Sequence, residues 1–221
     1  MPEVMKGSSG HKLFALFVSL SLLVFWRPLW PLGQFALGSE QYSHILLIPF
    51  VSLVLLFQKR SRFFGSKERD WTGGSALVGA GVRFHSLYLT VGNGLSENDR
   101  ISLAIFSAVL VWLGLFLLCY GRESFRGAVF PLCFLFLMVP IPEVILGIMI
   151  EFLQKASAET TDILFRISGI PVYRQGLVFS LPGVTIEVAR ECSGIRSSLA
   201  LFTTSLLAGH LFLRTRGRKA L

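Results

Sequence analysis

The chain has 221 residues, of which 52% are hydrophobic and only 15% are charged, and 20 of them are phenylalanine. This composition excludes an ordinary soluble domain and is typical of a protein that crosses a membrane several times. The formal net charge of +8 does not indicate a nucleic-acid partner. The positive residues gather at the ends of apolar runs and form no basic stripe, so no nucleic-acid partner is predicted. We therefore expect one integral-membrane domain over residues 1–221, with the lipid bilayer as its surroundings.

Five apolar runs are expected to be spanning helices, and they cover residues 13–30, 44–57, 72–91, 101–120 and 127–139. Residues 31–43 are expected to form an outside loop after the first of them. The third run is rich in glycine, which permits close helix packing. The fifth run stops at Pro140-Ile141-Pro142, because two prolines disfavour a continued helix.

Residues 143–167 have an amphipathic pattern that does not suit a lipid-facing span. Val144 and Ile148 recur at helical spacing among charged residues such as Glu151 and Glu159. We expect a helix that lies at the outer interface or is re-entrant, with its acidic side toward a water-filled cavity. A second short span is the alternative.

Residues 171–189 alternate between polar and apolar residues on both sides of Pro182-Gly183, which predicts a β-hairpin at the outer face. A last span is expected over residues 195–213. The predicted fold is all-α: a polytopic membrane helical bundle of about six spans, one amphipathic or re-entrant helix, and a small β-hairpin before the last span.

The distribution of positive charge predicts the orientation of the chain. The clusters expected in the cytoplasm hold 13 of the 21 Lys and Arg residues: Lys6, Lys12, Lys59, Arg60, Arg62, Lys67, Arg69, Arg122, Arg126, Arg214, Arg216, Arg218 and Lys219. The rest of the chain is close to neutral. This assignment places Cys192 at the outer face, provided that residues 143–167 do not cross the membrane once.

Cys192 is the candidate catalytic residue. At the first turn of the following helix, unpaired N–H groups and the helix dipole would favour its thiolate. Arg196, four residues on, would lie on the same face and lower the pKa of the thiol further. Alternatively, Cys192 is a small buried residue and Arg196 an interface anchor. Cys119 and Cys133 lie in apolar runs and are expected to be packing residues, so neither a metal nor a cofactor is predicted.

The segment Glu191-Cys192-Ser193-Gly194-Ile195-Arg196-Ser197 resembles the cysteine box of the exosortase/archaeosortase family. These are membrane-embedded, transpeptidase-like enzymes that process C-terminal sorting signals. The resemblance extends from about residue 20 to residue 213 and includes Pro140-Ile141-Pro142. It implies that Cys192 forms an acyl-enzyme. Supporting roles are expected for Arg196, for the backbone N–H groups around Ser193 as oxyanion donors, and for Gly194, which leaves room for the substrate carbonyl.

The resemblance also implies the partners and the location. The substrates would be secreted proteins whose C-terminus carries a short Pro-Glu-Pro-like motif, an apolar helix and a basic tail. The chain would be a multi-pass protein of the inner membrane, with Cys192 on the periplasmic side and a link to exopolysaccharide production.

Exosortases use a cysteine with an arginine and a histidine on later spans, and this sequence has no matching position for either partner. We therefore expect either the front part of a longer, active enzyme or a short, inactive membrane assembly or substrate-binding protein of the same family. A small transporter is a third possibility, suggested by Arg83, His85 and the helix break at residues 140–142.

Overall fold

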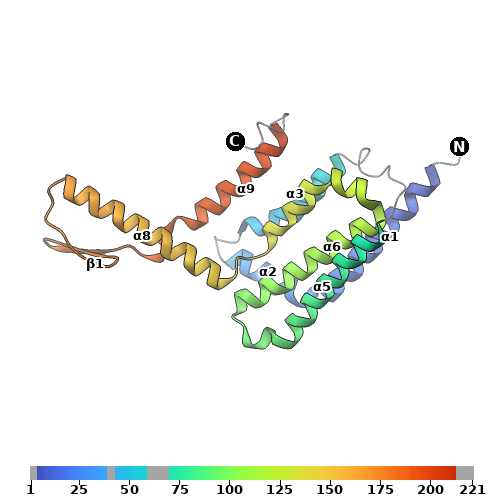
Figure 1. Cartoon of the computed structure of the whole chain (residues 1–221), viewed down its shortest axis with the longest axis horizontal. Helices are drawn as coiled ribbons and strands as arrows, with labels where there is room; N and C mark the ends of the chain where they lie inside the picture. Colours follow the sequence, from blue (N-terminus) through green and yellow to red (C-terminus); the bar gives the residue numbers. More distant parts are fainter. Residues whose placement is uncertain (1–3, 39–42, 59–69, 213–221) are drawn as a thin grey trace. The chain divides into compact units, whose positions relative to one another are not determined.

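The computed structural model describes residues 4–38, 43–58 and 70–212 (Figure 1). Most of these residues are helical, and one small antiparallel sheet precedes the last helix. The predicted combination of helices with a small β-element before the last helix is confirmed. The chain divides into two compact units, Met1–Ile141 and Pro142–Leu221.

The described part of the first unit is built from helices and 3₁₀ turns. In chain order these are α1 (Val4–Val24), α2 (Trp26–Gly38), η1 (Ser43–Leu46), α3 (Leu47–Gln58), α5 (Trp71–Val91), η2 (Gly92–Gly94), α6 (Glu97–Gly127), α7 (Val129–Phe134) and η3 (Leu135–Met138). Asp70 caps the start of α5 by accepting a hydrogen bond of 2.9 Å from the Gly73 N–H, and this bond lowers the pKa of the Asp70 carboxyl.

A break at Phe25 separates α1 from α2, so the first predicted span is not one continuous helix. The Phe25 side chain is 3% exposed and packs against Ala108 and Val111 of α6. Its ring lies 4.7 Å from the ring of His85. Burial of Phe25 thus stabilises the break. Because α2 continues to its end at Gly38, the prediction of an outside loop is wrong for residues 31–38.

Helices α5 and α6 lie side by side and form the most extensive helix contact among the described residues of the first unit (Figure 1). Glycines on both helices allow this approach. A Cβ added to Gly114 would lie only 2.7 Å from the backbone N of Val78 and 2.9 Å from the carbonyl O of Gly74. A Cβ added to Gly81 of α5 would likewise lie 2.9 Å from the carbonyl O of Ser107. The predicted role in close packing is confirmed for Gly74 and Gly81 of α5, whereas a Cβ at Gly79 would meet nothing within 4 Å.

Within the described residues, α6 alone is a single helix that is long and apolar enough to cross a membrane. Two pairs of helices, each interrupted by a short break, are also long and apolar enough to cross a membrane when each pair is counted as one span. The described residues then hold up to three spans. These pairs are Lys12–Val24 with Trp26–Gly38, and Val129–Met138 with Glu143–Ile167. The predicted membrane protein is therefore supported by at least one spanning helix, while six spans stay a prediction.

The predicted helix break at Pro140 to Pro142 is confirmed, because η3 ends at Met138 and the next helix begins at Glu143. Two side chains of α6 satisfy carbonyl groups at the break. The Ser102 hydroxyl donates to the Pro140 O at 2.8 Å, and the Asn98 amide donates to the Ile141 O at 2.7 Å. These bonds give the carbonyl groups of Pro140 and Ile141 partners at the place where the helix is interrupted.

The second unit holds two long helices and the sheet. Its elements are α8 (Glu143–Ile167), β1 (Tyr173–Gln175), β2 (Val178–Leu181), β3 (Val184–Glu187), η4 (Arg190–Ser193) and α9 (Ile195–Phe212). The sheet is antiparallel in the order β1-β2-β3. The predicted hairpin corresponds to β2 and β3, joined across Pro182 and Gly183, whose φ of 87° lies in the left-handed region. Strand β1 is an additional strand that the sequence did not predict.

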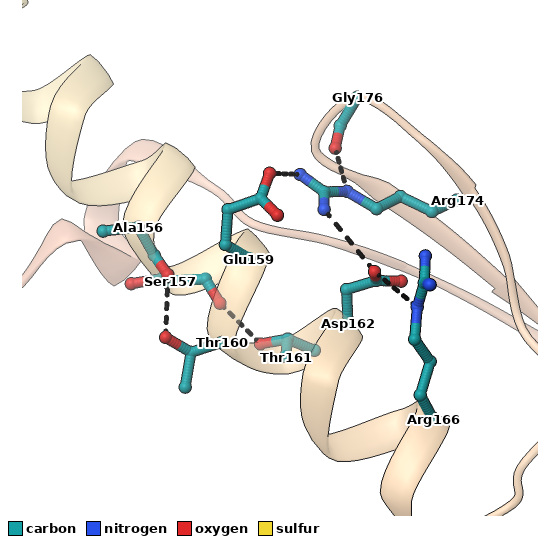
Figure 2. A network of polar contacts seen from close by, with 9 residues as sticks. All are labelled: Ala156, Ser157, Glu159, Thr160, Thr161, Asp162, Arg166, Arg174 and Gly176. Carbon is teal, nitrogen blue, oxygen red and sulfur yellow. Dashed lines mark hydrogen bonds and ion pairs between the residues drawn. The ribbon is translucent and has the colours of Figure 1, made fainter.

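One face of α8 is buried at every fourth residue, at Ile150, Gln154, Ala158 and Asp162. The acidic side of α8 meets Arg174 of β1 (Figure 2). Arg174 donates hydrogen bonds to the Glu159 carboxylate at 2.7 Å and to the Gly176 O at 2.9 Å, and it lies 3.9 Å from the Asp162 carboxylate. The hydrogen bond to Glu159 raises the pKa of Arg174. Arg174 therefore connects β1 of the sheet to α8 through ion pairs with Glu159 and Asp162.

Replacing Arg174 by Gln is expected to speed amide hydrogen exchange in β2 and β3 several-fold, because the substitution removes the cation that joins the sheet to α8. The matched control is Lys155→Gln on the same helix. Lys155 pairs with Glu151 at 2.6 Å, but both side chains are more than 60% exposed, and exposed pairs contribute little. Hydrogen exchange read by mass spectrometry on the full chain checks this. Equal effects of the two substitutions would contradict the assigned role.

Candidate functional site

The segment that leads to Cys192 is held from two sides. The Val188 N–H donates to the Leu177 O at 3.0 Å, which continues the sheet pairing beyond β3. The Gln154 side chain of α8 donates to the Val188 O at 2.8 Å. Gln154 is buried, so this bond is shielded from water. The chain therefore enters η4 from a fixed position within the second unit.

Cys192 lies in the 3₁₀ turn η4, and Gly194 separates this turn from α9. Gly194 has φ 69° and ψ 7°, a left-handed conformation that favours glycine. Its carbonyl accepts a hydrogen bond of 3.0 Å from the Ser198 N–H, so Gly194 is the N-cap of α9. The prediction that Cys192 occupies the first turn of the helix is therefore wrong. Cys192 lies two residues before the N-cap, on the side where the helix dipole is positive.

The expected geometry between Cys192 and Arg196 changes for the same reason. Arg196 belongs to the first turn of α9, whereas Cys192 belongs to η4. The rule that residues four apart share a helix face applies only within one continuous helix. The side chains of Glu191, Cys192 and Arg196 lie outside the described residues. A contact between Arg196 and the sulfur therefore stays a prediction.

Ser193 and Gly194 differ in how they are placed. The Ser193 side chain is 8% exposed, and among the described residues its hydroxyl has no hydrogen-bond partner. A buried hydroxyl without a partner costs about 1–3 kcal/mol, so this group is available to a ligand. A Cβ at Gly194 would meet nothing within 4 Å. The requirement for glycine there is the left-handed backbone, and space alone does not explain it.

The histidine of α9 lies far from η4. His210 is in the last turn of α9, about 22 Å along the helix axis from Ile195 at 1.5 Å per residue. His210 therefore lies at the opposite end of α9 from Cys192.

Sequence reasoning missed two features of the described residues. One is the contact of α8 with the segment before η4 through Gln154, and with the sheet through Arg174, which depends on tertiary packing. The other is a cleft in the first unit, lined by Arg27, Tyr88 and Arg100. These residues come from three helices and share no spacing that a motif search would detect.

Comparison of the whole sequence with models of known protein families agrees with the resemblance of residues 191–197 to the exosortase cysteine box. Residues 29–221 match the family model described as Transmembrane exosortase (Exosortase_EpsH). Comparison with curated proteins and with solved structures gave no match. The matched region covers most of the first unit and all of the second, including η4 and α9. The chain belongs to the transmembrane exosortase family.

Proposed function

We propose that this protein is a membrane cysteine peptidase or transpeptidase that processes C-terminal sorting signals of secreted proteins at the outer face of the inner membrane. Family membership supports a membrane exosortase-type protein. The observation that carries the chemistry is the order of η4, the left-handed Gly194 and the N-terminus of α9. This order puts Cys192 directly before a helix N-terminus, where the dipole favours a thiolate.

In the proposed reaction the Cys192 thiolate attacks the carbonyl carbon of the scissile peptide bond. The C–N bond then breaks, the leaving nitrogen takes a proton from solvent water and departs as the amine, and a thioester forms on Cys192. Water or an acceptor amine next attacks the thioester and releases the thiolate. The Ser193 hydroxyl and the backbone N–H groups at the start of α9 are proposed as donors to the tetrahedral oxyanion. His210 is not the acid that protonates the amine, because it lies at the far end of α9.

The proposed substrate fits the predicted topology. An apolar helix of the substrate would lie in the bilayer, with its basic tail on the cytoplasmic side. The Pro-Glu-Pro-like motif would then be at the outer face, where the charge distribution predicts Cys192. The three parts of the sorting signal thus match a substrate whose own tail is membrane-embedded.

Trapping the covalent intermediate tests this proposal. The full chain in membranes is incubated with a reporter protein that carries the motif, the apolar helix and the basic tail. We expect an adduct on the peptide that contains Cys192, which hydroxylamine cleaves because thioesters are sensitive to it. Cleavage of the reporter with an adduct on another residue would overturn the assignment of Cys192. Co-purification of the intact reporter without any adduct would instead support an inactive substrate-binding protein.

A further inference from the structure

A second site lies in the first unit, away from the cysteine box in sequence. It is a cleft of about 340 Å³ formed by α2, the end of α5, η2 and the start of α6. Its lining residues are Arg27, Pro28, Pro31, Tyr88, Gly92, Leu95, Glu97, Arg100 and Ile101. The volume lies at the low end of the range for small-ligand sites, roughly 300–1,000 Å³, and is too small for a folded partner.

The electrostatics of the cleft favour an anion. Arg27 from α2 and Arg100 from α6 contribute two guanidinium groups, and Glu97 is the one carboxylate among the residues that line it. Within the described residues, neither arginine forms an ion pair with a carboxylate. Two guanidinium groups on different helices match the planar, bidentate recognition of a phosphate.

Arg100 is held in place before any ligand binds. Its guanidinium carbon lies 5.6 Å from the centre of the Tyr88 ring, a cation–π contact. Tyr88 is buried and its ring lies 5.4 Å from that of His85, which in turn contacts Phe25 at the break between α1 and α2. This chain of rings connects α5 and α6 to the start of α2, where Arg27 lies. The two arginines are thus presented by one packed framework.

The aromatic residues beside Arg27 indicate the depth of the cleft in the membrane. Trp26 and Trp30 of α2 are 60% and 58% exposed, and their rings are 5.9 Å apart. Exposed tryptophans concentrate at the level of the lipid headgroups. In the predicted topology this end of the first unit faces outward, where Lys and Arg are disfavoured. A bound phosphate would explain two arginines at that place.

We propose that this cleft binds the phosphate of an anionic phospholipid headgroup, with Arg27 and Arg100 as the phosphate ligands and the Tyr88 ring as the support of Arg100. Glu97 opposes the anion and limits its affinity. The acyl chains would extend past the exposed tryptophans into the bilayer. This proposal does not depend on the chemistry at Cys192.

Native mass spectrometry of the full chain, titrated in neutral detergent with phosphatidylglycerol or phosphatidylcholine, tests the proposal. We expect tight binding of phosphatidylglycerol alone, and about tenfold weaker binding for Arg27→Gln or Arg100→Gln, since a hydrogen bond to a charged group is worth about that factor. Glu97→Gln is expected to tighten binding. The matched control is Arg122→Gln with Arg126→Gln, which removes two charges from the other end of α6.

Three outcomes would overturn the proposal. The first is equal loss of binding in the Arg122→Gln/Arg126→Gln control, which would show only general attraction to a basic protein. The second is weaker binding in Glu97→Gln. The third is displacement of phosphatidylglycerol by a short Pro-Glu-Pro peptide, which would assign the cleft to a peptide carboxylate. Competition by millimolar inorganic phosphate would instead support the phosphate site and identify free phosphate as a second source of the ligand. The double variant Arg27→Lys/Arg100→Lys keeps both positive charges but loses the guanidinium groups. It serves as a control that the arginine substitutions leave the chain folded.

Discussion

Replacing Cys192 by alanine is expected to reduce cleavage of a sorting-signal reporter below detection. The substitution removes the sulfur that forms the covalent bond, and loss of the nucleophile in well-studied covalent peptidases costs about 10⁶-fold. Because Cys192 lies in a short 3₁₀ turn, the backbone accepts alanine without strain. The measurement is the fraction of reporter converted in membranes that contain equal amounts of each variant.

Two matched substitutions make this result interpretable. Cys133→Ala removes an exposed thiol from α7 and is expected to leave cleavage unchanged. Ser193→Ala removes a buried hydroxyl that has no partner among the described residues, so the stability of the fold is not expected to fall. Cleavage by Ser193→Ala is nevertheless expected to drop by about 10²–10³-fold, the effect of losing one oxyanion donor. Full activity of Cys192→Ala would refute the proposed nucleophile.

Local signals in the sequence were sufficient for the main helices. Helix α8 has the bounds predicted from the amphipathic pattern, because Pro142 fixes its start and Gly169, with φ 69°, follows its end. Helix α5 agrees with the predicted span to within one residue at its start. The turn at Pro182 and Gly183 was also predictable, since proline followed by glycine has a strong preference for that geometry. In each case the deciding residues are neighbours along the chain.

The differences arise where distant packing decides the conformation. The break at Phe25 depends on a pocket formed by α6 and His85, and no local pattern reports it. The predicted end of the fourth span at Tyr120 agrees with the kink at Gly121, whose φ of 81° is non-helical, and only the helical segment that follows the kink, up to Gly127, was not predicted. Strand β1 has three residues, which is too short for an alternating pattern to be recognised.

The candidate sites divide in the same way. The cysteine box was recognisable because its residues are consecutive, but the position of Cys192 relative to α9 was not. That position depends on the left-handed conformation of Gly194, and the sequence could equally continue the helix back through it. The cleft of Arg27, Tyr88 and Arg100 lies at the other extreme, since only tertiary structure brings these residues together.

Replacing Gly114 by alanine is expected to destabilise the first unit by about 1–3 kcal/mol, the usual cost of overpacking a close contact. The new Cβ would lie 2.7 Å from the backbone N of Val78 and 2.9 Å from the carbonyl O of Gly74. Neither backbone atom can move without separating α5 from α6. A lower midpoint of thermal unfolding in detergent, compared with the unchanged chain, checks the prediction.

Gly79→Ala is the matched control for this prediction and is expected to have the opposite sign. Gly79 lies in the interior of α5, where a Cβ would meet nothing within 4 Å. Alanine should therefore stabilise the helix by up to about 1 kcal/mol, through propensity alone. If Gly114→Ala stabilised the protein as well, the close approach of α5 and α6 would be refuted. The contact between α5 and α6 also bears on the proposed phosphate site, because Tyr88 of α5 supports Arg100 of α6 across it. A wider separation of the two helices in Gly114→Ala would therefore weaken phosphate binding as well as stability.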